Sequence, residues 1–312
     1  MKIIFFVLAF VPIVVVAQEN FPDSLSWKIE LQGFNDAKSP KFRSDMPPEG
    51  KSFIIYGNPN QLSSINKIIN EKVKEYDPEE HVAVKMTFAT TNVVLRDTMK
   101  AAKVKKFFNK HSILVSDCEV FDYRPPVWTS PFQSNNQTGL QADIDTKEKI
   151  EGNGSLKLKG KKYPDKDYVC SLSRWLQTHS NSYQSDINIP DATPENFWIF
   201  LYVFGRGDST TYLNLMVRES GSEGGFNTDA YDYYEYNLPL NFAGWKQIAL
   251  KYSDITPVAS NNYVNSNQKL GQYGDHIRNI KYIQKIQYTF DSKTDDKVVE
   301  MNIDNLMILY NK

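Results

Sequence analysis

The feature that most constrains this fold is the alternation of side chains near the C-terminal end. In residues 245–252, WKQIALKY, the odd positions beginning at Trp245 face one way and the even positions ending at Tyr252 face the other. Residues 298–310 read as a closing strand, with apolar side chains at Met301, Ile303, Leu306 and Ile308. Alternation of this kind predicts strands with one buried face, so a second sheet has to cover them.

Further strands are predicted along the chain beyond residue 112. They cover residues 113–115, 117–122, 154–158, 168–176, 197–204, 212–218 and 231–238. The segment 197–204, FWIFLYVF, is apolar on both faces, as expected for a central strand of a sandwich. Because polar turns separate these short strands, residues 112–312 are predicted to form a jelly-roll β-sandwich.

Residues 20–110 have a mixed pattern that predicts a small α+β domain in front of the sandwich. Residues 52–56 and 82–88 read as strands, and the serines at 63–64 precede a helix with apolar side chains on one face. Residues 97–110 read as a basic amphipathic helix, whose lysines form either a solvated face or a surface for an anionic partner. The chain as a whole is therefore predicted to be mainly β.

The first 18 residues have the pattern of a secretory signal peptide. Lys2 precedes the apolar run 3–16, and Ala17 provides a small residue at the exit. An uncleaved N-terminal anchor is the alternative. With the signal peptide removed, we expect a secreted, periplasmic or cell-surface protein without stable membrane insertion. In such an oxidising compartment Cys118 and Cys170 can form a disulfide, and two buried free thiols are the alternative.

Composition and motifs argue against several functional classes. The net charge of −1 provides no basic field for nucleic acid. The four histidines are scattered without the spacing of a zinc site, and the chain has no Gly-x-Ser-x-Gly elbow. Asp229 or Asp232 could pair with Glu235 as the two carboxylates of a glycoside hydrolase. This is the less favoured interpretation, and we expect no enzymatic activity.

Four short segments resemble the galactose-binding-like jelly rolls found in many carbohydrate-binding modules. They are residues 117–119, Asp-Cys-Glu, together with residues 154–158, 244–248 and 303–306. The resemblance covers about residues 112–312 and implies a non-catalytic sandwich whose first and last strands are adjacent. It also implies a structural calcium with Glu119 and Asp304 among the ligands. The alternative is that Asp304 only hydrogen-bonds the loop beside it.

Carbohydrate recognition requires aromatic rings for stacking and polar side chains for the sugar hydroxyls. The segment 231–236, YDYYEY, is rich in aromatic side chains, and in a strand it places them on both faces. The candidate ligand-binding residues are Tyr231, Tyr233, Tyr234, Tyr236, Trp175, Arg206 and Arg218. Packing in the core is an equally good account of the tyrosines.

These observations predict an exported, non-catalytic carbohydrate-binding protein. Its ligand is expected to be an extracellular or cell-envelope polysaccharide, recognised by an aromatic sheet face. The alternative is a structural or accessory subunit of a cell-envelope protein complex, in which the same face contacts a protein.

Overall fold

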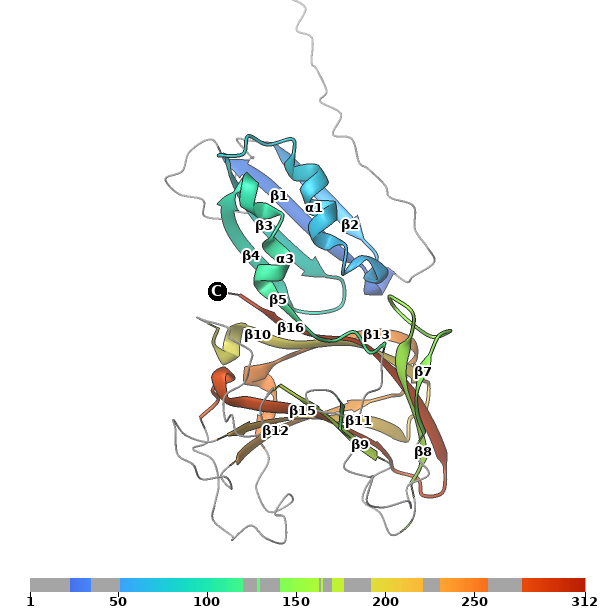
Figure 1. The fold of residues 1–312 in the computed structure, drawn as a ribbon. Coiled ribbons are helices and arrows are strands. Elements are labelled where there is room, and N and C mark those ends of the chain that lie inside the picture. Colours follow the sequence, from blue (N-terminus) through green and yellow to red (C-terminus); the bar gives the residue numbers. More distant parts are fainter. Residues whose placement is uncertain are drawn as a thin grey trace, which may run out of the picture. The chain divides into compact units, whose positions relative to one another are not determined.

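The computed structural model describes residues 23–34, 51–119, 128–129, 141–162, 164, 170–176, 192–220, 231–257 and 277–311. For residues 128–129, 141, 170–175, 220 and 231 the backbone alone is described. The chain forms two compact units (Figure 1). The first contains residues up to Ala89 and Arg96–Phe107, and the second contains Thr90–Leu95 and Phe108–Lys312. The predicted boundary near residue 111 lies close to this division. The predicted signal peptide, residues 1–18, lies outside the described residues.

The first unit is built on a sheet in the order β2-β1-β3-β4. Its strands are β1 (Trp27–Phe34), β2 (Ser52–Gly57), β3 (His81–Phe88) and β4 (Val94–Lys100). Helix α1 (Ile65–Val73) buries three side chains spaced four residues apart, Ile65, Ile69 and Val73, as the sequence predicted. The short 3₁₀ helices in this unit are η1 (Asp23–Leu25) and η2 (Pro59–Gln61).

Residues 97–110 do not form one helix, so that prediction was wrong. Strand β4 continues to Lys100, and only the short helices α2 (Ala101–Val104) and α3 (Phe107–His111) follow it. The β4 side chains Leu95 and Met99 are buried. Pairing of β4 with β3 in the sheet therefore overrides the helical spacing of the apolar residues.

The second unit is a sandwich of two antiparallel sheets, which confirms the predicted mainly β fold with a C-terminal jelly roll. Sheet I has the order β13-β10-β16-β8-β7, and β5 also pairs with β16. Its strands are β5 (Ser112–Ser116), β7 (Gln141–Asp145), β8 (Ser155–Lys161), β10 (Phe197–Arg206), β13 (Ala243–Lys251) and β16 (Val298–Tyr310). The early strand β5 thus lies beside the last strand β16, as the resemblance implied.

Sheet II has the order β14-β12-β11-β15-β9-β6. Its strands are β6 (Trp128–Thr129), β9 (Cys170–Trp175), β11 (Thr211–Ser220), β12 (Tyr231–Pro239), β14 (Thr256–Pro257) and β15 (Ile283–Ser292). The 3₁₀ helices η4 (Pro194–Asn196), η5 (Tyr252–Asp254) and η7 (Ile280–Tyr282) complete the second unit's described elements. In the part of the chain that the structure describes, no helix is long and apolar enough to cross a membrane.

The core of the second unit lies between the two sheets and follows the alternation of their strands. It includes Ile199, Leu201 and Val203 of β10, Leu213, Leu215 and Val217 of β11, and Ile286, Tyr288 and Phe290 of β15. Ile248 and Leu250 of β13 also belong to this core, which agrees with the faces predicted for residues 245–252. Burial of each such side chain contributes about 1.5–3 kcal/mol to the transfer free energy.

The closing strand β16 contains an irregularity that explains its apolar pattern. Met301 and Ile303 have odd numbers, whereas Leu306 and Ile308 have even numbers, yet all four face the core. Between them Asn305 has a positive φ of 48°, and the pairing register of β16 shifts in this region. A β-bulge inserts one extra residue and returns the following side chains to the same face.

Cys118 is a free and fully buried thiol. Burial, together with the nearby carboxyl of Asp304, raises the pKa of this thiol. The disulfide predicted for Cys118 stays a prediction, as does the alternative of two buried free thiols. The side chain of its predicted partner, Cys170, lies outside the described residues.

Candidate functional site

The predicted binding tyrosines of β12 divide between the two faces of sheet II. Tyr234 is 2% exposed, and its ring packs edge-on against Tyr252 with the ring centroids 5.4 Å apart. The guanidinium carbon of Arg278 lies 4.6 Å from the Tyr234 ring centroid. Tyr234 is thus a core residue, as the packing alternative stated, while Tyr233 lies on the outer face and is half-buried. The side chain of Tyr231 lies outside the described residues.

The outer face of sheet II brings together three of the predicted binding residues. Tyr233 of β12 lies opposite Arg218 of β11, Arg218 lies opposite Lys285 of β15, and Lys285 lies opposite Trp175 of β9. Directly opposed residues of neighbouring strands share a face. These four positions therefore form one row across the sheet. The neighbouring rows are Glu235, Met216, Gln287, and Asn237, Asn214, Thr289. We call these positions the Tyr233–Arg218 face.

Neutral amides orient the polar side chains around this face. The Arg218 Nε–H donates to Gln284 Oε1 at 2.8 Å, and Lys285 Nζ donates to Gln287 Oε1 at 2.9 Å. In a neighbouring row Asn214 Nδ2 donates to Asn237 Oδ1, also at 2.9 Å. Burial and, to a smaller extent, the positive charge of Arg218 together lower the pKa of Lys285 to about 7. Lys285 therefore changes charge near neutral pH, within a face that carries hydrogen-bonding groups.

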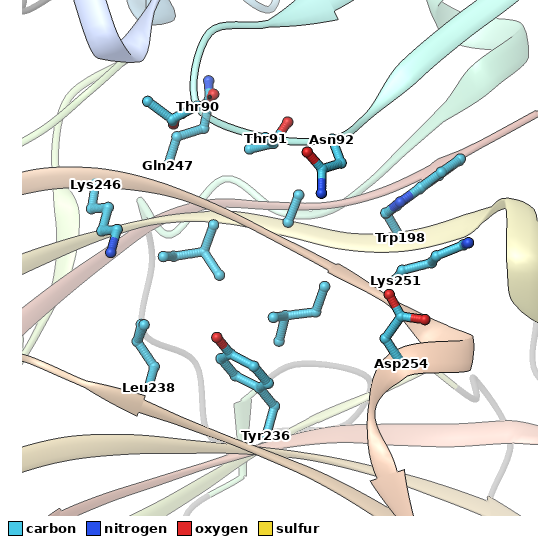
Figure 2. A pocket seen from close by; sticks show the side chains of 13 residues that line it. Thr90, Thr91, Asn92, Trp198, Tyr236, Leu238, Lys246, Gln247, Lys251 and Asp254 are labelled. Carbon is cyan, nitrogen blue, oxygen red and sulfur yellow. Dashed lines mark hydrogen bonds between the residues drawn. The ribbon is translucent and has the colours of Figure 1, made fainter.

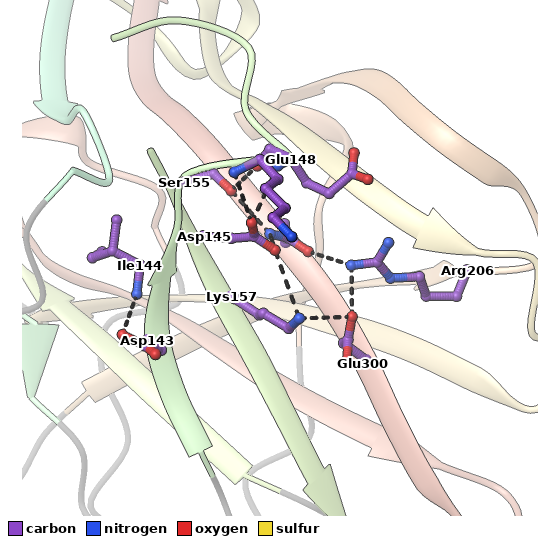
Figure 3. Close-up of polar contacts among 10 residues, drawn as sticks. Asp143, Ile144, Asp145, Glu148, Ser155, Lys157, Arg206 and Glu300 are labelled. Atoms are coloured by element: carbon purple, nitrogen blue, oxygen red, sulfur yellow. Dashed lines mark hydrogen bonds and ion pairs between the residues drawn. The ribbon is translucent and has the colours of Figure 1, made fainter. Parts of the chain in front are cut away.

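Arg206 lies on the other sheet and belongs to a network of charged side chains (Figure 3). Its Nη2 lies 2.6 Å from Glu300 Oε1 and donates to Asn302 Oδ1 at 3.0 Å. Lys157 continues the network, with Nζ 3.1 Å from Glu300 Oε1 and 3.6 Å from Asp145 Oδ2. The structure therefore does not place Arg206 with Tyr233 and Arg218. Its described contacts tie β10 to β16.

Tyr236 lies beside a cavity that the sequence analysis did not predict (Figure 2). The cavity has a volume of about 340 Å³. Its lining residues are Thr90, Thr91, Asn92, Trp198, Tyr236, Leu238, Asp254 and the whole of Lys246–Lys251. We call it the edge cavity. Tyr236 is 38% exposed, and β14 pairs with β12 only at Tyr234 and Glu235. The sequence pattern does not show where this pairing stops.

The two predicted calcium ligands both hold the loop that precedes β8. Asp304 Oδ2 accepts the Ile150 N–H at 2.7 Å, and its Oδ1 accepts the Asn305 N–H at 2.8 Å. Glu119 Oε1 accepts the Asn153 N–H at 2.8 Å, and its Oε2 accepts Asn153 Nδ2 at 2.9 Å. Burial is the main reason that the pKa of Asp304 is raised to about 7.

Each carboxylate oxygen of the pair accepts a hydrogen bond from an N–H group, so both side chains fix the loop. Calcium is coordinated by several oxygen atoms. Within the described ranges, no group of three or more His, Cys, Asp or Glu side chains is arranged to hold a metal ion. The residues present thus fit the alternative in which Asp304 hydrogen-bonds the loop beside it. Calcium binding stays a prediction, and no step of the function proposed below depends on it.

The carboxylates of Asp232 and Glu235, one of the two pairs considered for glycoside hydrolysis, do not converge. Asp232 is 5% exposed, and Glu235 lies three positions further along β12 and is therefore on the opposite face. Asp229 lies outside the described residues. The pairing of Asp232 with Glu235 is therefore incompatible with two carboxylates flanking one glycosidic bond.

Solved structures that resemble this chain include carbohydrate-binding modules. A family 11 module from Clostridium thermocellum, in complex with a β-1,3-1,4-mixed-linked tetrasaccharide, is 14% identical, with 64% of this chain and 96% of the module covered at a TM-score of 0.42. A family 30 module is 9% identical, with 64% and 98% covered at a TM-score of 0.37. A glycoside hydrolase domain of Endo-D from Streptococcus pneumoniae R6 is 16% identical, with 58% and 21% covered at a TM-score of 0.28. The predicted jelly roll itself is confirmed by the two packed antiparallel sheets of the second unit.

No protein-family model matches the sequence, and no curated protein matches it either. The site must therefore be interpreted from its own side chains. Two places in the second unit have the chemistry of a ligand site: the Tyr233–Arg218 face and the edge cavity.

Proposed function

We propose that this protein is an exported, non-catalytic carbohydrate-binding protein that recognises an extracellular or cell-envelope polysaccharide through the Tyr233–Arg218 face. The observation that carries the proposal is the row Tyr233, Arg218, Lys285 and Trp175 across sheet II. Positions far apart in the sequence thereby share one face of the sheet. A sugar would contact this row, where Tyr233, Arg218 and Lys285 are half-buried, because Met216 and Asn214 at the centres of the neighbouring rows are only 1% and 7% exposed.

The chemistry of this face supports a sugar ligand. The half-buried ring of Tyr233 supplies an apolar surface for the C–H groups of a pyranose ring. Arg218, Lys285 and Gln287 supply donors and an acceptor for hydroxyl groups. Because Gln284 and Gln287 already orient the two cations, less conformational entropy is lost on binding than with free side chains.

The absence of catalysis is part of the proposal and rests on the carboxylates of β12. Asp232 and Glu235 lie on opposite faces of the strand, so they cannot act on one glycosidic bond. Export rests on the sequence of residues 1–18, with its basic start and apolar run.

Binding of the mature protein to a glycan array tests the proposal. Tyr233→Ala should weaken binding to the recognised glycan by about tenfold or more, as expected for loss of an aromatic contact at the centre of a site. Tyr56→Ala is the matched control, because Tyr56 is 61% exposed on β2 of the first unit. Its binding should equal that of the wild type, and circular dichroism should show that both variants are folded.

Three results would count against the proposal. If no glycan binds to the folded wild type, the carbohydrate function is wrong, and a subunit of a cell-envelope protein complex becomes the better interpretation. If binding occurs but Tyr233→Ala and Tyr56→Ala behave alike, the ligand does not use the Tyr233–Arg218 face. Release of reducing sugar from the bound glycan would contradict the non-catalytic assignment.

A further inference from the structure

The edge cavity lies where the margins of the two sheets meet. Strand β13 is the terminal strand of sheet I, and among the described residues it pairs only with β10. Strand β12 pairs with β14 only at Tyr234 and Glu235, so Tyr236 and the residues after it also lie at a margin. The sandwich is therefore open on this side.

The cavity follows the edge of β13 and is not confined to one face of the strand. Every residue from Lys246 to Lys251 lines it. Successive residues of a strand point to opposite faces, so only a space along the edge contacts all of them. The edge also presents backbone N–H and C=O groups, which are donors and acceptors of hydrogen bonds.

Apolar side chains form part of the cavity wall. Ile248 and Leu250 are each 7% exposed, and Leu238 is 6% exposed, so their core-facing side chains close the inner end. Tyr236 is 38% exposed and supplies an accessible aromatic ring. A ligand with apolar C–H groups can therefore contact this wall while the core residues behind it stay buried.

Polar side chains surround this apolar wall (Figure 2). Tyr236 lies across the cavity from Thr91 and Asn92, with Lys246 at one end and Asp254 at the other. Gln247 is 3% exposed, donates through Nε2 to the Tyr202 hydroxyl at 3.2 Å and accepts from Thr90 Oγ1 at 3.4 Å. Gln247 is thus fixed, while hydroxyl, amide, ammonium and carboxylate groups are present together in one small space.

This combination favours a saccharide over other small ligands. Hydroxyl-rich ligands require both donors and acceptors around an aromatic or aliphatic wall. The volume of about 340 Å³ lies at the lower end of the range of about 300–1,000 Å³ that is usual for small-molecule sites. The cavity therefore suits the end of a chain better than a long segment. Lys246 and Lys251 on the strand disfavour addition of another β-strand at this edge.

We propose that the edge cavity is a second saccharide site, which takes the terminal sugar units of a glycan chain with Tyr236 as the stacking residue. The proposal rests on the proposed function in that both sites bind sugar, but it concerns different residues. The Tyr233–Arg218 face takes an internal stretch of polymer, and the edge cavity takes an end. One molecule then has two independent contacts with its ligand.

Isothermal titration of the full mature chain with short oligosaccharides tests the second site. The probes are tetrasaccharides of β-linked glucose, galactose, mannose and xylose. We expect two binding events per chain with the recognised tetrasaccharide. Tyr236→Ala should weaken one of them by about tenfold or more, and Tyr233→Ala should weaken the other. Asp254→Ala is a second cavity variant at an exposed position, and it should affect the same event as Tyr236→Ala.

The outcomes separate the two proposals. Tyr56→Ala is again the control and should retain both events, and circular dichroism reports whether each variant is folded. A single event lost only in Tyr233→Ala would overturn the second site and leave the proposed function standing. A single event lost only in Tyr236→Ala and Asp254→Ala would support the edge cavity and remove the role given to the face. No event with any tetrasaccharide, combined with no polysaccharide binding, would overturn both.

Discussion

At the scale of single residues, Lys285 is the side chain whose charge is most affected by the fold. Its ammonium group is half-buried beside Arg218, and burial lowers its pKa from 10.5 to about 7. The unfolded chain therefore binds a proton at Lys285 over a pH range in which the folded protein does not. By linkage, the contribution of Lys285 to the free energy of unfolding increases as the pH rises from about 7 towards 10.

This effect is measurable with Lys285→Met, which retains a long side chain without the charge. The unfolding free energy of the wild type should increase relative to that of the variant as the pH rises from 7 to 10. Urea denaturation at several pH values measures it, with Lys293→Met as a control at an exposed position. A difference that is constant over this range would show that Lys285 is not held in a desolvated site.

At the scale of elements, the loop before β8 is fixed from both sides by Glu119 and Asp304. Gly152 in this loop has a φ of +70°, and a Cβ at this position would lie 1.4 Å from Glu119 Oε1. Gly152→Ala should therefore destabilise the protein through two effects, backbone strain of about 1 kcal/mol and a clash with Glu119.

A matched pair of variants separates these two effects. Gly244 also has a positive φ, of 90°, but no atom lies within 4 Å of a Cβ added there. Gly244→Ala should thus show the strain alone and a smaller loss in unfolding free energy than Gly152→Ala. Adding Glu119→Ala to Gly152→Ala should remove the clash and restore part of the lost unfolding free energy. If the two glycine variants lose equal stability in urea denaturation, the Glu119 carboxylate does not lie against Gly152.

Elements with clear alternation were predictable from sequence, and those decided by their neighbours were not. Strand β13 lies where period-2 patterning placed it, and β10 lies where the continuous apolar run placed it. Strand β15 was missed although Ile286, Tyr288 and Phe290 alternate with polar residues in the same way. Residues 97–100 were assigned to a helix because Met99 continues the apolar and basic pattern of residues 102–110, whereas in the structure Met99 is buried in β4. Only pairing with β3 decides between helix and strand.

The candidate site follows the same division. The odd and even positions of β12 correctly separate Tyr233 from Tyr234 and Tyr236, but the sequence does not reveal which face is the core. The row Tyr233, Arg218 and Lys285 depends on the register of three strands from distant parts of the chain. Arg206 shows the limit most clearly, since its residue type suits a binding site but its strand belongs to the other sheet.

At the scale of the whole molecule, the two compact units have separate hydrophobic cores. The first contains Trp27, Ile29 and Ile69, whereas the second contains Leu201, Leu215 and their neighbours. A chain with two such cores is expected to unfold in more than one step. Because both proposed saccharide sites use residues of the second unit, a bound sugar should stabilise that unit alone.

Differential scanning calorimetry of the mature protein measures this directly. We expect two transitions, of which only one moves to higher temperature when the recognised tetrasaccharide is added. Saturation at one hundred times Kd corresponds to about 2.7 kcal/mol for each site. The shift should be reduced in Tyr233→Ala and unchanged in Tyr56→Ala, since Tyr56 belongs to the first unit. If the tetrasaccharide raises both transitions equally, or raises the one that Tyr56→Ala perturbs, its binding involves the first unit and the assignment of both sites to the sandwich is wrong.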